Sequence, residues 1–269
     1  AMSAFAERHV DLRTFVYIAP DAGKVADGVA VPLVSHPETY PQIRETFLAR
    51  KGEALTWIDG EVSYGDFLQW WYKTDHHWNT RGAYNAYTRI ATALSFGEKV
   101  VVPTGEIILD EPHFYGALAR LGLNGSYYDD LIDFTFDSFP EYAVAINGKE
   151  VKESALFERD LDAISWQANQ YANRYTELFH TDYAEIVITN AESPSDTSLL
   201  IVGDSYTNCM ERFLAAHYRN TYVYDPRSAS ETLDEFLIEH EDVDDVVFLM
   251  RRINTFNRAT LNSLQPKEV

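Results

Sequence analysis

The sequence has little cysteine, little positive charge and no long apolar run. Its 269 residues include one cysteine, Cys209, so an intrachain disulfide framework is excluded. Lysine and arginine total 22 against 42 aspartate and glutamate residues, which gives a formal net charge of −20. Such a surface repels nucleic acid and anionic lipid head groups, so nucleic acid is not an expected partner. No apolar run reaches the ~18–20 residues that span a bilayer, and no signal peptide is visible.

The remaining composition is that of an ordinary globular protein, with 46% hydrophobic and 24% charged residues. The length permits one large domain or two small ones. We predict a single domain over residues 1–269, with an irregular insertion at approximately 100–196. Within that insertion, Asn147-Gly148 separates two short runs in residues 142–151, which is a strong signal for a β-hairpin.

The C-terminal third shows the clearest pattern of secondary structure. Apolar runs in residues 198–208, 221–227 and 244–252 have the character of buried strands, and residues 231–240 have helical periodicity. A further helix is expected directly after the first of these strands. Alternating strands and helices with short links predict an α/β fold with a mostly parallel central sheet.

Three of these strands deliver polar residues to the same edge of the predicted sheet. Ser205, Arg227 and Arg251 each follow a strand, and function in open parallel sheets collects beyond the carboxyl ends of the strands. Arg227 and Arg251 could pair with the many acids, but their position also makes them candidates for substrate binding. Trp78 and Tyr206, which flank the candidate catalytic residues described next, are further candidates for substrate contact.

Ser205 is the candidate nucleophile. Gly203 allows a tight turn after the strand, and the N-terminus of the expected helix would offer backbone N–H groups to an oxyanion. A serine needs a base, and the base needs a third group that orients it. Asp75 and His77, two residues apart just before a predicted helix with Thr80 as its N-cap, can supply both. His76, between them, is expected to point away.

Other interpretations of these residues remain open from the spacing alone. Asp75, His76 and His77 could form part of a metal site, but even with His113 or His180 they do not show the consistent spacing of three or four ligands, so no metal or cofactor is expected. Cys209 is expected to be a small buried side chain. The aromatic residues of this region suit either the core or a platform for sugar rings: Trp70, Trp71, Tyr72 and Trp78.

Two motifs carry a resemblance to a known family. Thr-Asp-His-His-Trp at residues 74–78, followed by Gly82-Ala83, and Leu-Leu-Ile-Val-Gly-Asp-Ser-Tyr at 199–206 resemble the DHHW family of bacterial surface proteins. That family is similar to the SGNH-hydrolase-like alginate O-acetyltransferase proteins. The segment 224–227 also resembles the family's strand that ends in Asp-x-Arg. The likeness spans roughly residues 15–256.

The resemblance implies a flavodoxin-like, three-layer α/β/α fold with a Ser-His-Asp triad. It assigns Ser205 as nucleophile, His77 as base and Asp75 as the group that orients His77. The Asp-x-His segment precedes the serine, which is the reverse of the order in ordinary SGNH esterases. The glycine and asparagine that supply oxyanion donors in ordinary SGNH enzymes have no counterpart that the sequence identifies.

The implied function is O-acetyl transfer to an exported or cell-surface polysaccharide through an acyl-enzyme. An esterase with the same triad and a non-catalytic glycan-binding or scaffold protein are the alternatives. The expected partners are a polysaccharide acceptor, neutral or weakly charged because of the acidic surface, and a membrane-bound acetyl-donor protein. The expected location is extracellular, cell-surface or periplasmic, with a signal or membrane anchor that precedes this sequence.

Overall fold

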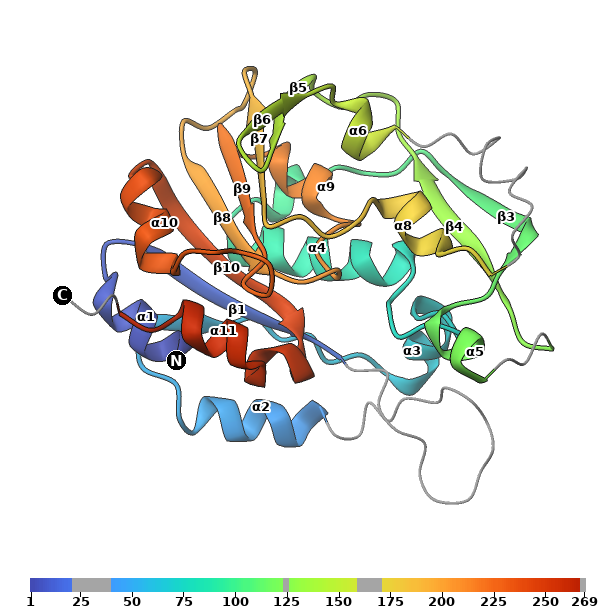
Figure 1. Ribbon diagram of the computed structural model, residues 1–269, viewed down its shortest axis with the longest axis horizontal. Coiled ribbons are helices and arrows are strands. Elements are labelled where there is room, and N and C mark those ends of the chain that lie inside the picture. The colour runs from blue at the N-terminus through green and yellow to red at the C-terminus, as the bar shows by residue number, and fades with distance from the viewer. Residues whose placement is uncertain (21–39, 123–125, 159–170, 267–269) are drawn as a thin grey trace.

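A mixed sheet of eight strands forms the centre of the computed structural model, which describes residues 1–20, 40–122, 126–158 and 171–266. The strand order is β2-β1-β10-β8-β9-β7-β5-β6 (Figure 1). The bounds are β1 Arg13–Ala19, β2 Leu55–Trp57, β5 Tyr142–Ile146, β6 Lys149–Val151, β7 Glu185–Asn190, β8 Ser198–Gly203, β9 Asn220–Tyr224 and β10 Val243–Arg251. A separate antiparallel pair joins β3 (Gly105–Phe114) to β4 (Asp129–Thr135).

The helices among the described residues lie between these strands in the chain. They are α1 Met2–Arg8, α2 Tyr40–Leu48, α3 Tyr64–Trp70, α4 Thr80–Ala93, α5 Ala117–Gly122, α6 Ser154–Phe157, α8 Arg174–Phe179, α9 Glu211–Ala215, α10 Leu233–Glu239 and α11 Arg258–Ser263, with the 3-10 turns η2 Gly97–Lys99 and η3 Arg252–Phe256. No helix of the described ranges combines the length and apolar character that crossing a membrane requires.

The prediction of a mostly parallel sheet holds for only part of it. The strands β2, β1, β10, β8 and β9 pair in parallel, whereas β9–β7, β7–β5 and β5–β6 pair antiparallel. All three antiparallel strands come from the region that was predicted as an insertion. A tight turn joins β5 to β6, which requires these two strands to run antiparallel. The region thus adds antiparallel strands to one edge of the parallel part, and the sheet as a whole is mixed.

The predicted hairpin is confirmed, but it does not stand alone. Asn147 and Gly148 have φ angles of 49° and 72°, as a two-residue turn with the hairpin twist requires. The turn joins β5 to β6, and β5 also pairs with β7. The hairpin therefore belongs to the central sheet. Residues 123–125 and 159–170 of the predicted insertion lie outside the described residues.

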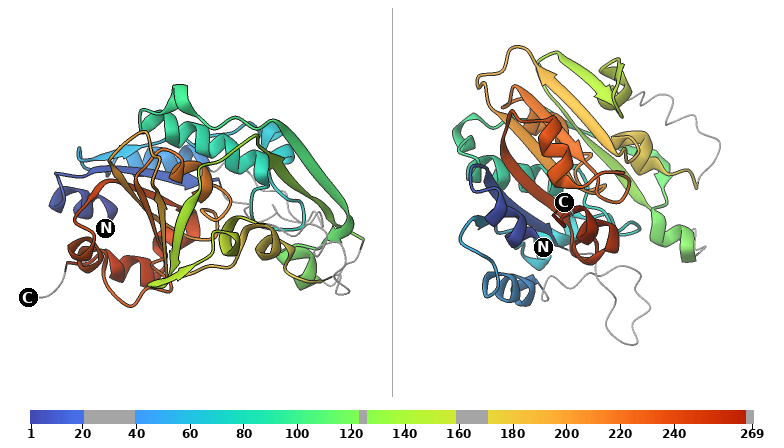
Figure 2. Two further views of the ribbon diagram at one scale, coloured as in Figure 1. Left: turned by 90° about the horizontal axis from the view of Figure 1, so that it is seen from above. Right: turned by 60° about the vertical axis from the view of Figure 1, so that its left-hand side comes forward.

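Two apolar cores cover the two faces of the sheet, which gives three layers. Alternate residues of β8 enter different cores: Leu199 and Ile201 pack with the face of α4, and Leu200 and Val202 pack with α1 and α10. This alternation follows from the two-residue period of a strand. Figures 1 and 2 show α4 on the side of the sheet opposite α10 and α11.

The N-cap of α4 lies one residue earlier than predicted. The side chain of Asn79, and not that of Thr80, accepts hydrogen bonds from the N–H groups of Arg81 and Gly82. Thr80 instead donates its hydroxyl to the carbonyl of Ile132. A Cβ at Gly82 would lie 2.6 Å from the carbonyl oxygen of Trp70, so only glycine lets α4 approach α3 this closely.

We expect His217 to make the fold less stable in acid. Burial, with a contribution from Lys99, lowers the pKa of His217 to about 4, and its Nε2 lies 2.7 Å from the Tyr87 hydroxyl. An unfolded histidine titrates near ~6.5, so the unfolded chain binds the extra proton between pH 6.5 and 4 and stability falls through that window. His217→Gln should flatten this part of the pH dependence in urea unfolding relative to wild type. An unchanged slope would contradict the assignment.

Candidate active site

The segment from Lys73 to Asn79 is a tight elbow held by buried polar contacts. Asp129 accepts hydrogen bonds from the N–H groups of Lys73 and Thr74 and from the Thr74 hydroxyl, at 2.6–2.8 Å. The N–H of Tyr72 donates to the carbonyl of His77, and that of Asn79 to the carbonyl of Trp70. Backbone hydrogen bonds therefore join the two ends of the elbow, and Asp129 anchors it to β4. These contacts fix the backbone from which Asp75 and His77 extend.

Ser205, His77 and Asp75 form one chain of hydrogen bonds. His77 Nε2 lies 2.7 Å from Ser205 Oγ, and His77 Nδ1 lies 2.6 Å from Asp75 Oδ1. The proximity that the sequence predicted, across 128 positions of the chain, is thus observed. Asp75 and His77 are buried, with 2% and 6% of their surfaces exposed. The geometry is that of a nucleophile, a base and an orienting carboxylate.

Asp75 is held as a carboxylate. Burial alone would raise its pKa, but the hydrogen bond and charge of His77, the charge of His76 and the N–H of Ala117 together lower the pKa well below its usual range. Ala117 donates to Asp75 Oδ2 at 2.6 Å. A Cβ at Gly116 would lie 2.3 Å from the carbonyl oxygen of Thr74, so glycine is required for this approach. Asp75 therefore accepts from two sides at once.

Ser205 stands in an irregular turn after β8, and the prediction of a helix directly behind it is wrong. The next helix, α9, begins only at Glu211. The buried side chain of Asp204 shapes the turn by accepting from the N–H groups of Tyr206 and Arg251 and from the Asn254 amide. Oxyanion stabilisation would therefore come from the turn itself. The N–H of Ser205 has no hydrogen-bond acceptor among the described residues.

Tyr175 contacts both His77 and Ser205, and no pattern in the sequence indicated it. Its ring stacks on the imidazole of His77, with centroids 3.8 Å apart and planes 11° apart. Its hydroxyl donates to the carbonyl of Ser205 at 2.8 Å. Tyr175 lies on α8, about 100 residues after the elbow and 30 before the serine. No spacing rule connects it to either motif.

The side chain of His76 does not point away from Asp75 and His77, contrary to the prediction. Its ring centroid lies 3.9 Å from that of His77, and its Nδ1 lies 3.3 Å from Asp75 Oδ1. Burial, with contributions from His77 and Arg251, lowers the pKa of His76 to about 4. His76 is therefore neutral near pH 7, and it contributes to the wall of the cleft described below.

The three side chains that were weighed as metal ligands lie close together. The ligand atoms of Asp75, His76 and His77 all lie within 4.8 Å of one another. Both ring nitrogens of His77 are engaged, one with Asp75 and one with Ser205. A structural metal site requires three or four ligands. The arrangement thus fits a proton-transfer chain better than a metal site.

The predicted substrate contacts of Trp78 and Tyr206 are wrong. Both side chains are fully buried. The indole N–H of Trp78 donates to Cys209 Sγ at 3.0 Å, and the Tyr206 hydroxyl donates to the carbonyl of His76. Both residues pack the elbow against the turn that carries Ser205. Cys209 is the expected small buried side chain, and burial raises the pKa of its thiol to about 12.

Arg227 and Arg251 do share a cleft with Ser205, as the sheet-edge argument predicted. The cleft has a volume of about 520 Å³ and is also lined by His76, Ile253, Asn254, Phe256 and Asn257. The guanidinium of Arg227 is bound by Asp225 and Asp182. That of Arg251 makes no ion pair among the described residues, and its buried Nε has no hydrogen-bond partner. Of these two arginines, only Arg251 thus has a positive charge that is not paired with an acid of the described residues.

The fold is shared with solved bacterial proteins. Bacillus cereus PatB1 aligns with a TM-score of 0.71 and 17% identity over 98% of this chain and 89% of that one. A second PatB1 structure, with a sulfonyl adduct, aligns at 0.70 and 16% identity over 96% and 86% of the two chains. A DHHW family protein from Eubacterium siraeum aligns at 0.71 and 18% identity over 98% and 87%.

These likenesses establish the class of fold. The α/β architecture with a large mixed sheet is similar to the fold of the DHHW family protein from Eubacterium siraeum, as the motif resemblance implied. Identities of 16–18% carry the fold and not the activity. No protein-family model and no curated protein matches the chain.

Proposed function

We propose that the protein is a serine-dependent acyltransferase that moves an acetyl group to a hydroxyl of an exported or cell-surface polysaccharide. The observation that carries the proposal is the unbroken chain from Ser205 through His77 to Asp75, at 2.7 and 2.6 Å. The motif resemblance to the DHHW family and to alginate O-acetyltransferase proteins supplies the choice of acyl group and acceptor. A decayed binding protein would have no reason to keep this geometry.

The reaction proceeds in two acyl transfers. Ser205 Oγ gives its proton to His77 Nε2 and attacks the acetyl carbonyl carbon of the donor. As the bond to the donor oxygen breaks, His77 returns the proton to that oxygen and Ser205 is left as its acetyl ester. A sugar hydroxyl then gives its proton to His77 and attacks the ester, and Ser205 leaves and regains the proton. Asp75 holds the imidazole in the required tautomer throughout.

The developing oxyanion is stabilised by groups of the turn and the cleft. The N–H of Ser205 supplies one donor, since nothing else occupies it among the described residues. Arg251 and the amide of Asn254 line the same cleft, and they are the candidates for the second contact. Donors preorganised toward the position of the oxyanion typically contribute about 100- to 1,000-fold each.

The acceptor is neutral or weakly charged. The overall charge of −20 opposes a polyanion, and Arg251 is the one uncommitted cation that lines the described cleft. Two exposed apolar side chains in the cleft wall, Ile253 and Phe256, suit the flat faces of sugar rings. The donor would be a membrane-bound protein partner, and the site of action the cell surface or periplasm.

Transfer to water by the same triad is the alternative that the acyl-enzyme permits. The purified protein should release p-nitrophenol from p-nitrophenyl acetate, and a sulfonyl fluoride should inactivate it by capturing Ser205. Adding neutral oligosaccharides separates the two functions. A transferase produces acetylated sugar at the expense of free acetate, whereas an esterase yields only acetate at every sugar concentration. Lack of both products and of inactivation would overturn the proposal.

The two arginines of the cleft should respond differently to substitution. Arg251→Gln should lower kcat/KM for p-nitrophenyl acetate about 100-fold with little change in unfolding temperature, because Arg251 lines the cleft without an ion-pair partner among the described residues. Arg227→Gln should instead lower the unfolding temperature, because it leaves Asp225, 4% exposed, without its bidentate partner. The reverse pattern in paired kinetic and thermal-unfolding measurements would contradict this assignment.

A further inference from the structure

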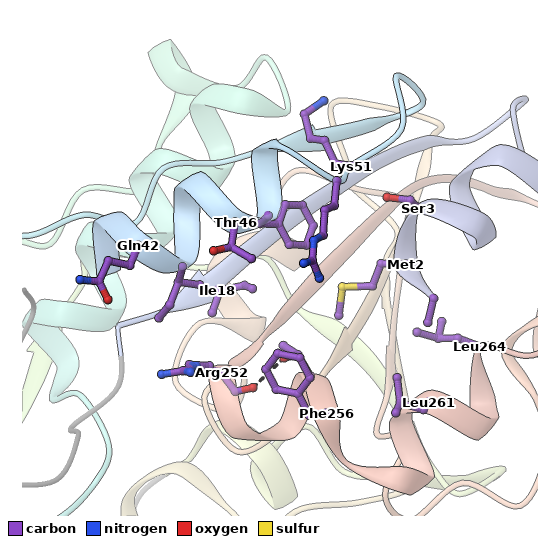
Figure 3. A pocket seen from close by; sticks show the side chains of 15 residues that line it. Met2, Ser3, Ile18, Gln42, Thr46, Lys51, Arg252, Phe256, Leu261 and Leu264 are labelled. Carbon is purple, nitrogen blue, oxygen red and sulfur yellow. Dashed lines mark hydrogen bonds between the residues drawn. The ribbon is translucent and has the colours of Figure 1, made fainter. Parts of the chain in front are cut away.

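A second cavity, separate from the cleft of Ser205, lies between α1, α2 and the segment from η3 to α11 (Figure 3). It has a volume of about 530 Å³, which is within the range of ligand sites. Figure 3 shows Gln42 and Thr46 from α2 opposite Arg252 and Phe256 from η3. Apolar side chains dominate its interior: Met2, Ile18, Ile43, Phe47, Leu261 and Leu264.

The charged residues in the wall of this cavity are all basic. Arg50, Lys51 and Arg252 line it, and none of its described lining residues is acidic. The Lys51 ammonium donates to the carbonyl of Leu55 at 2.8 Å. The guanidinium groups of Arg50 and Arg252 make no ion pair or hydrogen bond among the described residues.

This local charge is unusual for the chain. Acids outnumber bases by 20 over the whole sequence, and several other arginines are paired with acids, as Arg44 is with Asp59 and Glu61, and Arg81 with Glu106. An apolar cavity with two unpaired guanidinium groups is complementary to a molecule that has an apolar body and an anionic end. The acidic surface disfavours anionic membranes as a whole, so the complementarity is confined to this cavity.

We propose that this cavity binds a single-chain anionic amphiphile. The alkyl chain lies among Ile43, Phe47 and Leu261, and the carboxylate or phosphate head contacts Arg50 and Arg252. A sugar is a poorer occupant than an alkyl chain because apolar side chains dominate the interior. An alkyl chain gains about fourfold in affinity for each methylene that it buries.

The cavity is adjacent to the catalytic cleft. Phe256, with 70% of its surface exposed, lines both. Of the neighbouring arginines, Arg251 lines the cleft and Arg252 lines the cavity. A bound alkyl chain would cover Phe256 and rest against the η3 segment that forms the cleft wall. The proposal needs no chemistry at Ser205, so Ser205→Ala should bind the amphiphile as wild type does.

The test is isothermal titration of the whole chain with dodecyl phosphate and with dodecanoate, both kept below micelle formation. One molecule should bind per chain, butyl phosphate should not bind, and dodecyl maltoside, with its neutral head, should bind more weakly. Tighter binding of the phosphate would indicate a phospholipid-type head, and tighter binding of dodecanoate a free fatty acid. No saturable binding of either anion would overturn the proposal.

Substitutions of residues that line the cavity test whether the amphiphile binds there. Thr46 is exposed on α2 and lines the cavity, so Thr46→Trp should fill the cavity and abolish binding without unfolding the protein. Arg50→Gln and Arg252→Gln should each weaken binding of the anions about fivefold. Arg258→Gln, an exposed arginine of α11 outside the cavity, is the matched control and should change nothing. Equal binding by wild type and Thr46→Trp would place the amphiphile elsewhere and refute the site.

Discussion

Ser205→Ala and His77→Gln should each reduce the hydrolysis of p-nitrophenyl acetate by at least about 1,000-fold while the fold persists. The reason is the single path for the proton: the Ser205 hydroxyl lies 2.7 Å from His77 Nε2. Without the hydroxyl there is no nucleophile, and without the imidazole the hydroxyl remains protonated at neutral pH. Because the two groups act in one step, the double variant should lose little more than either single variant.

His76→Asn is the matched control for these variants. His76 is adjacent in sequence and 3.9 Å from the His77 ring, but it makes no hydrogen bond to Ser205. It should therefore keep most of the activity. Circular dichroism and thermal unfolding establish that each variant is folded. If His76→Asn abolishes activity and His77→Gln does not, His76 is the base and the proposed chain is wrong.

Asp75→Asn should be nearly as damaging, with kcat lower by up to about 10,000-fold. Asp75 accepts from His77 Nδ1, from the His77 N–H and from the Ala117 N–H. An amide can satisfy Ala117 only by turning its NH₂ group toward His77. The imidazole would then accept at Nδ1 and carry its proton at Nε2, where it cannot take the proton of Ser205.

Asp130→Asn, an exposed acid on β4, is the control for the loss of one negative charge and should leave kcat unchanged. Steady-state kinetics of both variants, together with urea unfolding, separate a catalytic effect from a loss of stability. A fall in kcat of less than about tenfold for a folded Asp75→Asn would mean that Asp75 does not set the tautomer of His77.

The sequence predicted the site best where local chemistry and strand order decide it. Gly-Asp-Ser after a buried strand and Asp-x-His before a helix are weak signals singly, but together they supply a nucleophile, a base and an orienting carboxylate, and His77 does contact Ser205. Arg251 was found by the same reasoning, because the carboxyl ends of parallel strands share an edge. The antiparallel half of the sheet escaped prediction because its strands lie in a region of irregular pattern, where only Asn147-Gly148 gave a turn signal.

Adjacency in sequence to a site residue is a poor guide to side-chain direction at Trp78 and Tyr206. Each follows a residue of the site, but each side chain turns into the core and braces the elbow or the turn. Tyr175 and Asn254, by contrast, were not predicted because they are far in sequence from the site residues that they contact. They reach the site from α8 and η3 through tertiary packing, and neither belongs to a motif with a recognisable spacing.

In the proposed mechanism Ser205 carries the acetyl group between donor and acceptor. The most direct measurement is peptide mass spectrometry of the protein quenched in acid during turnover of p-nitrophenyl acetate. The proposed mechanism predicts an acetyl group on Ser205, present in the wild type, more abundant when neutral oligosaccharide is left out, and missing in Ser205→Ala. An active protein whose acetyl group is found on another residue, or on none at any quench time, would contradict it.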